Sequence, residues 1–446
     1  MEKEYSQSRR QMLTETPIPK LIVKLSIPTI ISMMVTALYN SADTYFVGKI
    51  STEATAAVGL VFSVMAIIQS LGFFCGHGSG NYLSRMLGAG KKEEANVMAS
   101  TGFALALILG TILAVVGNLF IHRISGWVGA TPTTIEDTEK YMRIILIGAP
   151  FMMGQFVINN QLRFQGNAFY AMIGLMCGAV INIFLDPLLI LYFGMGVEGA
   201  AIATVAGQIT SFFVLLIGSM KGENIKLNVR NIKFSTRFFV EIVNGGAPSL
   251  LRQGMAAVAT LMLNSAAGKF GGAPAIAGMS IVTRVMLMMI AALIGFGQGY
   301  QPVCSFNYGA KLYSRVKQGY FFCLRWGFVF LLAIGVLCFT FAPEIVGWFR
   351  NDPEVIKVGA FALRCQSSVI ALSAPIVMTN MMLQSIGAGL RASILASARN
   401  GLFFIPLIIV LPIFFGLTGV QITQTVSDVL TMILTIPMAY SELRKM

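Results

Sequence analysis

Long apolar stretches separated by short polar connections run through this chain from end to end. A helix needs roughly 20 mostly apolar residues to cross the hydrocarbon core of a bilayer, and each stretch is at least that long. The pattern predicts twelve such helices, at residues 25–48, 54–83, 95–121, 138–162, 168–193, 197–219, 239–264, 274–306, 318–342, 355–385, 393–415 and 417–440. We therefore expect an all-α integral membrane protein.

The longest polar stretch divides these helices into two sets of six. The predicted domains are an N-terminal tail (1–24), a first six-helix bundle (25–220), a linker (221–237), a second bundle (238–440) and a C-terminal tail (441–446).

The two halves repeat short motifs at a nearly constant offset. Gly-His-Gly at 76–78 is matched by Gly-Gln-Gly at 297–299, and Gly88-Ala89 by Gly309-Ala310, both 221 residues later. Six helices per half is an even number, so both copies enter the membrane in the same direction. Such parallel repeats occur in transporters, where the substrate route lies between the halves. The fold class predicted is two pseudo-symmetric six-helix bundles.

Composition agrees with the membrane interpretation, since 56% of the residues are hydrophobic and only 11% are charged. The net charge of +13 does not indicate a nucleic-acid partner, because Lys and Arg cluster in short connections. Twenty of the 32 cations, Arg163 among them, fall on one side of the predicted topology and seven on the other. Cytoplasmic loops carry this excess. We expect a multi-pass protein of the cell membrane with both termini cytoplasmic.

Several chemistries find no support in the sequence. The six cysteines form no CxxC pair, and His77 and His122 have no spacing typical of a metal site. No GxxxxGK[ST] motif indicates ATP binding. A membrane-embedded transferase would need convergent His, Asp or Cys groups at one membrane face, and none is evident. We expect neither an enzyme nor a cofactor.

Acidic residues at membrane depth are the strongest candidates for function, because a charge at the bilayer centre costs about 2.5–3.5 kcal/mol on insertion scales. Asp186 and Asn182 are four residues apart on one helix face, and Pro187 deprives a carbonyl one turn earlier of its usual donor. Such oxygen-rich clusters suit Na⁺ or a transferable proton. Thr204 would add a hydroxyl, and Asp43 is a second buried acid.

Other polar residues at depth are candidates for the lining of a substrate cavity. Asp428, in the last helix, has no comparable polar cluster in the sequence. The cavity candidates are Tyr39, Asn159, Asn160, Asn264, Arg284, Asn380 and Gln384.

In these residues the chain resembles the MATE (multidrug and toxic compound extrusion) family. The matching stretches cover essentially the whole chain and are Ser26–Pro28, Tyr39–Asp43, 76–90, Ala149-Pro150, Asn182–Pro187, Gly199–Thr204 and 302–310. As in the DinF-like and MepA-like branches, the resemblance implies cation binding at Asp43, Asn182, Asp186 and Thr204. Other branches use acids in the seventh and tenth helices, where this chain has Glu241 near the start of the seventh and Asn380 and Gln384 in the tenth.

The resemblance implies a V-shaped cavity and export of amphipathic or cationic drugs in exchange for H⁺ or Na⁺. We expect a monomer that alternates access between its two bundles. A lipid-linked oligosaccharide flippase of related architecture is the main alternative, although such a protein would be expected to place several cations in its cavity. A membrane-embedded transferase is less favoured.

Overall fold

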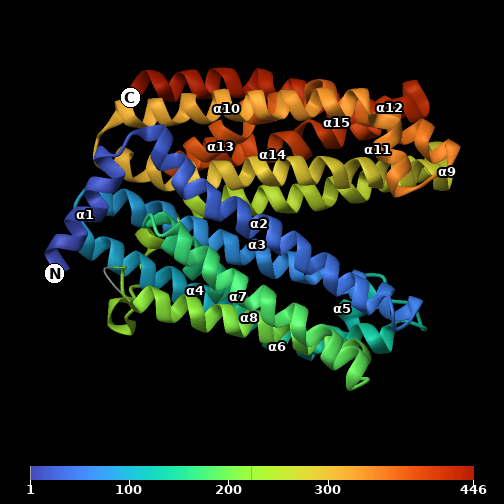
Figure 1. Ribbon diagram of the computed structural model, residues 1–446, viewed down its shortest axis with the longest axis horizontal. Helices are drawn as coiled ribbons and strands as arrows, with labels where there is room; N and C mark the ends of the chain where they lie inside the picture. Colours follow the sequence, from blue (N-terminus) through green and yellow to red (C-terminus); the bar gives the residue numbers. More distant parts are fainter. Residues whose placement is uncertain (1, 222–223) are drawn as a thin grey trace.

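The computed structural model describes residues 2–221 and 224–446, apart from the side chains of residues 2–8, 37–42 and 44. Within these residues there are helices and connections but no strand. The elements, drawn in Figure 1, are α1 (Glu2–Glu15), α2 (Ile18–Val47), α3 (Thr52–Gly88), α4 (Lys92–Leu119), α5 (Ile121–Trp127), α6 (Ile135–Phe164), α7 (Ala168–Pro187), η1 (Leu188–Tyr192), α8 (Gly196–Met220), η2 (Val229–Asn231), α9 (Thr236–Gly309), α10 (Tyr313–Thr340), α11 (Ala342–Phe349), α12 (Pro353–Val369), η3 (Ile370–Leu372), α13 (Ser373–Ile386), α14 (Gly389–Ser397), η4 (Ala398–Leu402) and α15 (Phe404–Lys445).

Ten helical stretches of the described chain are long and apolar enough to cross a membrane. Two of them are pairs of helices joined at a glycine, since Gly272 in α9 has φ 65° and Gly416 in α15 has φ 56°. Only glycine adopts such a conformation without strain, so each glycine reverses the chain within one residue. Counted this way the described residues contain twelve spans, as predicted.

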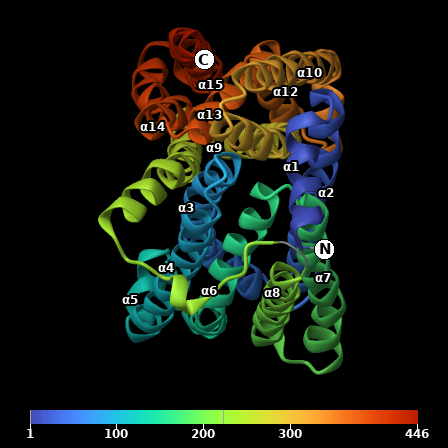
Figure 2. The same ribbon diagram turned by 90° about the vertical axis from the view of Figure 1, so that its left-hand side faces the viewer.

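The helices form two lobes, as Figures 1 and 2 show from two directions. The first-half helices α3, α4, α6, α7 and α8 make one lobe, and α9, α10 and α12–α15 make the other. The internal repeat extends to the helix bounds. α10 begins and ends 221 residues after α4, and α11 begins 221 residues after α5. The predicted fold class is confirmed.

Glycines bring the backbones of the two lobes together at the end where both chain termini lie (Figure 1). A Cβ on Gly88 of α3 would collide with the backbone oxygen of Phe306 in α9, and one on Gly309 with the backbone oxygen of Arg85. Beside this contact the Arg85 guanidinium pairs with the Glu241 carboxylate at 2.7 Å, again between α3 and α9. The repeated glycine motifs are therefore sites of close helix packing.

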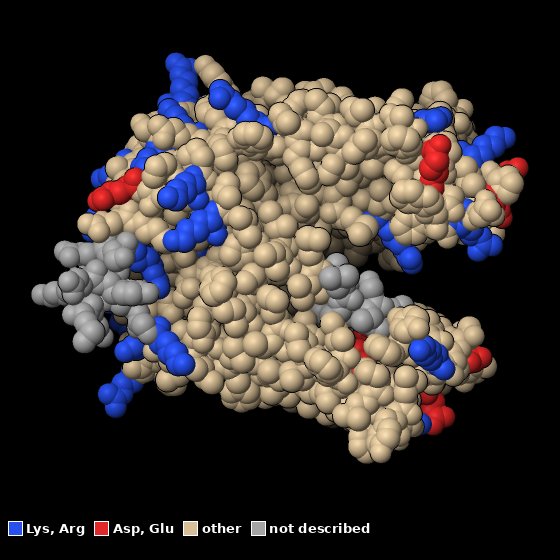
Figure 3. All heavy atoms as spheres, in the orientation of Figure 1, with Lys and Arg blue, Asp and Glu red and all other residues tan. Residues whose placement is uncertain are grey.

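At the opposite end the lobes separate. Figure 3 shows an opening between them at the end remote from the termini. Lys and Arg side chains gather at the two ends of the molecule, and the long surface between them is almost free of charge in this view. That uncharged band is what a bilayer requires of the surface facing its hydrocarbon core.

We predict that Gly88→Ala destabilises the folded protein. The added Cβ meets a backbone carbonyl, which cannot swing aside as a side chain can, and overpacking of this kind costs about 1–3 kcal/mol. The midpoint of thermal unfolding (Tm) of the purified protein should fall by several degrees. The control is Gly59→Ala on the same helix, where a Cβ meets nothing within 4 Å. Equal melting of both variants would contradict a close contact at Gly88.

Candidate functional site

Asp186 lies where an α-helix gives way to a π-helix. It is the penultimate residue of α7, and η1 continues the chain with π-helical geometry directly after Pro187. Single π-helical turns inside helices occur frequently at functional sites. The Asp186 side chain is fully buried, and Asn182 Nδ2 donates to its Oδ1 at 3.4 Å.

Three oxygens of this cluster have no hydrogen-bond donor among the residues that the structure describes. They are Asp43 Oδ1, Asn182 Oδ1 and Asp186 Oδ2. Asp43, on α2, is 4% exposed and close enough to Asp186 for the two carboxyl groups to interact electrostatically. Buried polar atoms are normally paired, because leaving one unpaired costs free energy. A proton or a small cation would satisfy these oxygens.

The remaining members of the predicted ion site are only partly placed. Thr204 is buried on α8 at 4% exposure. The side chain of Tyr39 lies outside the described residues. Gln208, one turn after Thr204 on the same helix, is a buried amide with both polar atoms unpaired among the described residues, and the sequence analysis did not select it. Gln208 is four residues after Thr204, and this spacing places both side chains on the same helix face, which could have identified Gln208 from the sequence.

A second polar centre surrounds Arg163, which the sequence analysis assigned to a cytoplasmic connection. That assignment is wrong: α6 continues to Phe164, and Arg163 is 2% exposed. Its guanidinium donates to Gln298 Oε1 and Asn160 Oδ1, both at 2.5 Å, and lies 3.0 Å from His77 Nε2. The repeat offset of 221 pairs Arg163 with Gln384, a position already placed at depth, and that was the missed signal.

This centre joins the two halves through uncharged partners. Gln298 belongs to α9 and His77 to α3, and His77 Nδ1 lies 2.9 Å from the hydroxyl of Ser249 on α9. The contacts of Arg163 with Gln298 and of His77 with Ser249 link the first half of the chain to the second. Arg163 therefore anchors the lobes to each other at the level of the repeated Gly-His-Gly and Gly-Gln-Gly motifs.

Asn159 and Asn380 are equivalent residues with the same contact. Asn159 Nδ2 donates to the carbonyl of Ala171 at 2.8 Å, and Asn380 Nδ2 to that of Ala392 at 2.7 Å. Donor and acceptor are both shifted by 221 residues, so the bond is repeated between corresponding helices. A role for either asparagine in binding substrate stays a prediction, and in this conformation both link helices.

The other cavity candidates have different surroundings. Gln384 is fully buried, donates to the hydroxyl of Ser249 at 2.8 Å and accepts from Gln301 at 2.9 Å. Arg284 is exposed on α9, and Asn264 is half-buried. Their proposed contacts with substrate also stay predictions.

Asp428 has a polar cluster that the sequence analysis did not find. Arg399, within the π-helix η4, donates through Nε to Oδ1 at 2.8 Å and through its NH2 group to Oδ2 at 3.0 Å. Gln424 adds a third donor at 2.7 Å. Asp428 is therefore a paired acid, unlike Asp186.

No group of three or more His, Cys, Asp or Glu that could hold a metal ion occurs in the described part of the chain.

Comparison with known proteins gives one family. The family model described as MatE matches residues 28–188 and 248–410, once in each half. Multidrug export protein MepA of Staphylococcus haemolyticus is 28% identical over 433 residues, which cover 96% of this chain and 94% of that protein. MepA of Staphylococcus aureus strain MSSA476 is 27% identical, with 91% and 90% coverage.

Solved structures agree along nearly the whole length. A MOP superfamily transporter from Pyrococcus furiosus, described with a binding pocket of reversed polarity, superposes with a TM-score of 0.90 at 29% identity and 98% coverage of both chains. A MATE protein in a bent conformation gives a TM-score of 0.92 at 28% identity, also with 98% coverage of both. The chain belongs to the MatE family of membrane transporters.

We predict that neutralising Asp428 destabilises the protein, whereas neutralising Asp186 does not. Asp428→Asn leaves Arg399 without its charge partner, and breaking a buried pair costs about 3–5 kcal/mol. Asp186→Asn removes an unpaired buried carboxylate and keeps an oxygen for Asn182, so Tm should hold or rise. The measurement is thermal unfolding in Na⁺-free buffer at alkaline pH. A loss of stability in Asp186→Asn as large as in Asp428→Asn would mean that Asp186 has a structural partner.

Proposed function

We propose that this protein is a secondary active multidrug efflux transporter. It exports amphipathic or cationic small molecules across the cell membrane in exchange for H⁺ or Na⁺, and it works as a monomer. The observation that supports the proposal best is the pair of buried carboxyl groups, Asp43 and Asp186, with oxygens unpaired among the described residues, in a chain whose relatives are multidrug export proteins.

Coupling follows from the cost of a bare carboxylate in the lobe interior. An ion that enters from outside binds at Asp43 and Asp186 and satisfies the unpaired oxygens of Asp43, Asp186 and Asn182. The bound and unbound states then differ in the packing of α2 against α7. A ligand shifts a conformational equilibrium only through such a difference in affinity. Ion entry thereby supplies the free energy for moving the drug outward.

The direction of transport follows from the topology. Both termini are cytoplasmic, and the opening at the far end faces outward. Drug loading requires the end near the termini to open instead, so the first bundle (25–220) and the second (238–440) rock about each other. That motion breaks the pair between Arg85 and Glu241 and parts the backbones at Gly88 and Gly309.

We predict that Asp186→Asn abolishes drug efflux. Cells that carry the variant should accumulate a fluorescent cationic dye to the level of cells without the transporter, because the neutral amide neither takes up a proton nor attracts Na⁺. The control is Asp137→Asn, the same change at a partly exposed position in the first turn of α6. Efflux at the wild-type level in Asp186→Asn would refute the assignment.

The coupling ion is identified in proteoliposomes. A Na⁺ gradient and a pH gradient are imposed in separate experiments. We expect one of them to drive dye transport by the wild-type protein, and we expect that gradient to drive no transport by Asp43→Asn. Transport that continues with neither gradient would contradict secondary active coupling.

A further inference from the structure

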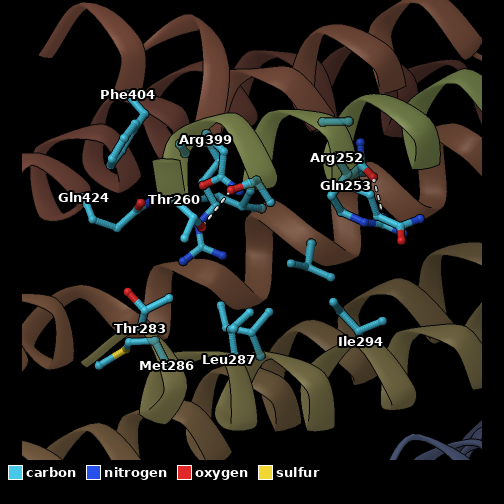
Figure 4. A pocket seen from close by; sticks show the side chains of 18 of the residues that line it. Arg252, Gln253, Thr260, Thr283, Met286, Leu287, Ile294, Arg399, Phe404 and Gln424 are labelled. Carbon is cyan, nitrogen blue, oxygen red and sulfur yellow. Dashed lines mark hydrogen bonds between the residues drawn. The ribbon is translucent and has the colours of Figure 1, made fainter. Parts of the chain in front are cut away.

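The second lobe contains a cavity that none of the proposed transport steps uses. It has a volume of about 300 Å³, at the lower end of the range of small-molecule pockets. Its walls come from both segments of α9, from α12 and α13, and from α14 to α15. Figure 4 shows Arg252 and Gln253 at one end, with Leu287 on the opposite wall.

The polar groups of this pocket carry a net positive charge. Two cations, Arg252 and Arg399, line it, and no acidic side chain is among the described lining residues. Arg399 is neutralised by Asp428 from behind the wall. Arg252 has no ion pair within the described chain, and its one hydrogen bond there is a long one, to Asn380 Oδ1 at 3.4 Å. One guanidinium therefore faces the pocket uncompensated.

The depth of Arg252 makes this charge unusual. It lies sixteen residues into α9, roughly 24 Å along the helix at 1.5 Å per residue, and so well inside the bilayer. A cation at such depth costs free energy and is normally paired, or serves an ion or substrate. Arg163, which is also deep in the molecule, is surrounded by three uncharged partners, whereas Arg252 has one weak contact.

The rest of the lining is apolar with a few amides. The amide groups include those of Gln253, Asn380 and Gln424. The long apolar wall includes Met286, Leu287 and Phe404. A pocket with one unpaired cation, adaptable amides and an apolar wall matches a ligand with one negative group on an apolar body. The charge is opposite to that of the acidic cluster in the first lobe.

We propose that this cavity is a binding site for amphipathic monoanions, such as an aryl or alkyl carboxylate. Arg252 pairs with the anionic head, Gln253 and Asn380 orient it, and the apolar wall along the second segment of α9 holds the body. The site lies in the other lobe from Asp43 and Asp186, and it does not depend on the proposed drug/cation exchange.

The test uses three probes of equal shape on the full-length protein in nanodiscs of zwitterionic lipid. Radiolabelled 2-naphthoate, the neutral 2-naphthamide and the cationic 2-(aminomethyl)naphthalene are compared by equilibrium binding. We expect naphthoate to bind at least tenfold more tightly than either of the others, since hydrogen bonds to charged groups are worth a factor of this order. Equal binding of naphthoate and naphthamide would overturn the proposal.

Variants separate the pocket from other sites. Arg252→Gln should weaken naphthoate binding about tenfold or more, and Arg252→Lys should retain part of it. Arg325→Gln, the matched control at an exposed arginine of α10 outside the pocket lining, should leave binding unchanged. Ala256→Leu, which adds a side chain to the pocket wall and keeps Arg252, should weaken all three probes, so the proposal is tested even if Arg252→Gln does not fold.

Two further arms identify the source of the anion and its relation to transport. Anionic phosphatidylglycerol in the nanodisc should compete with naphthoate if lipid is the natural occupant, and should leave binding unaltered if the occupant is a free anion. Asp186→Asn should bind naphthoate as the wild type does. Loss of naphthoate binding in Asp186→Asn, or unchanged binding in both Arg252→Gln and Ala256→Leu, would refute an independent anion site.

Discussion

The cost of placing a charge in hydrocarbon governs where this protein keeps its ionisable groups. The ionisable side chains in the interior are compensated in different ways. Arg399 and Asp428 neutralise each other, and Arg163 is surrounded by hydrogen-bonding side chains that carry no formal negative charge. Asp186 retains an oxygen that no described residue satisfies. An unpaired buried charge keeps a desolvation cost that the rest of the protein does not offset. A ligand that pairs with this charge removes the cost, and its binding can therefore favour one conformation over another.

The two halves share an architecture and differ in electrostatics. The repeated asparagine contact at Asn159 and Asn380 shows that the backbone plan is the same in both lobes. Each half also has a π-helix in its fifth membrane-spanning segment. In the first half it follows Asp186, and in the second it contains Arg399. Duplication thus preserved the helix arrangement, while the polar groups beside the irregular turns took opposite charge.

The long apolar stretches alone were sufficient to predict the helices, because length and apolar content decide whether a segment can span a bilayer. Asp186 and Asp43 could be selected because an acid inside an apolar run is costly wherever its neighbours lie. Arg163 could be recognised only through the repeat, since an arginine near a helix end looks the same in sequence whether it meets solvent or lies under the other lobe. The pairing of Arg399 with Asp428 joins residues 29 apart on different helices, so it depends on tertiary packing that no local pattern contains.

Contact through glycine also determines how easily the lobes can part. Where helices interlock through large side chains, separating them requires many rotamers to change together. At Gly88 and Gly309 the surfaces that meet are backbone, with no side chain inserted from either glycine into the opposite helix. When the two helices separate at these glycines, no side chain has to be withdrawn from the opposite helix and no cavity is left behind. In the alternating-access cycle proposed above, the barrier to switching orientation would then be set by polar pairs beside the glycines, such as Arg85 with Glu241, which water can replace as they break.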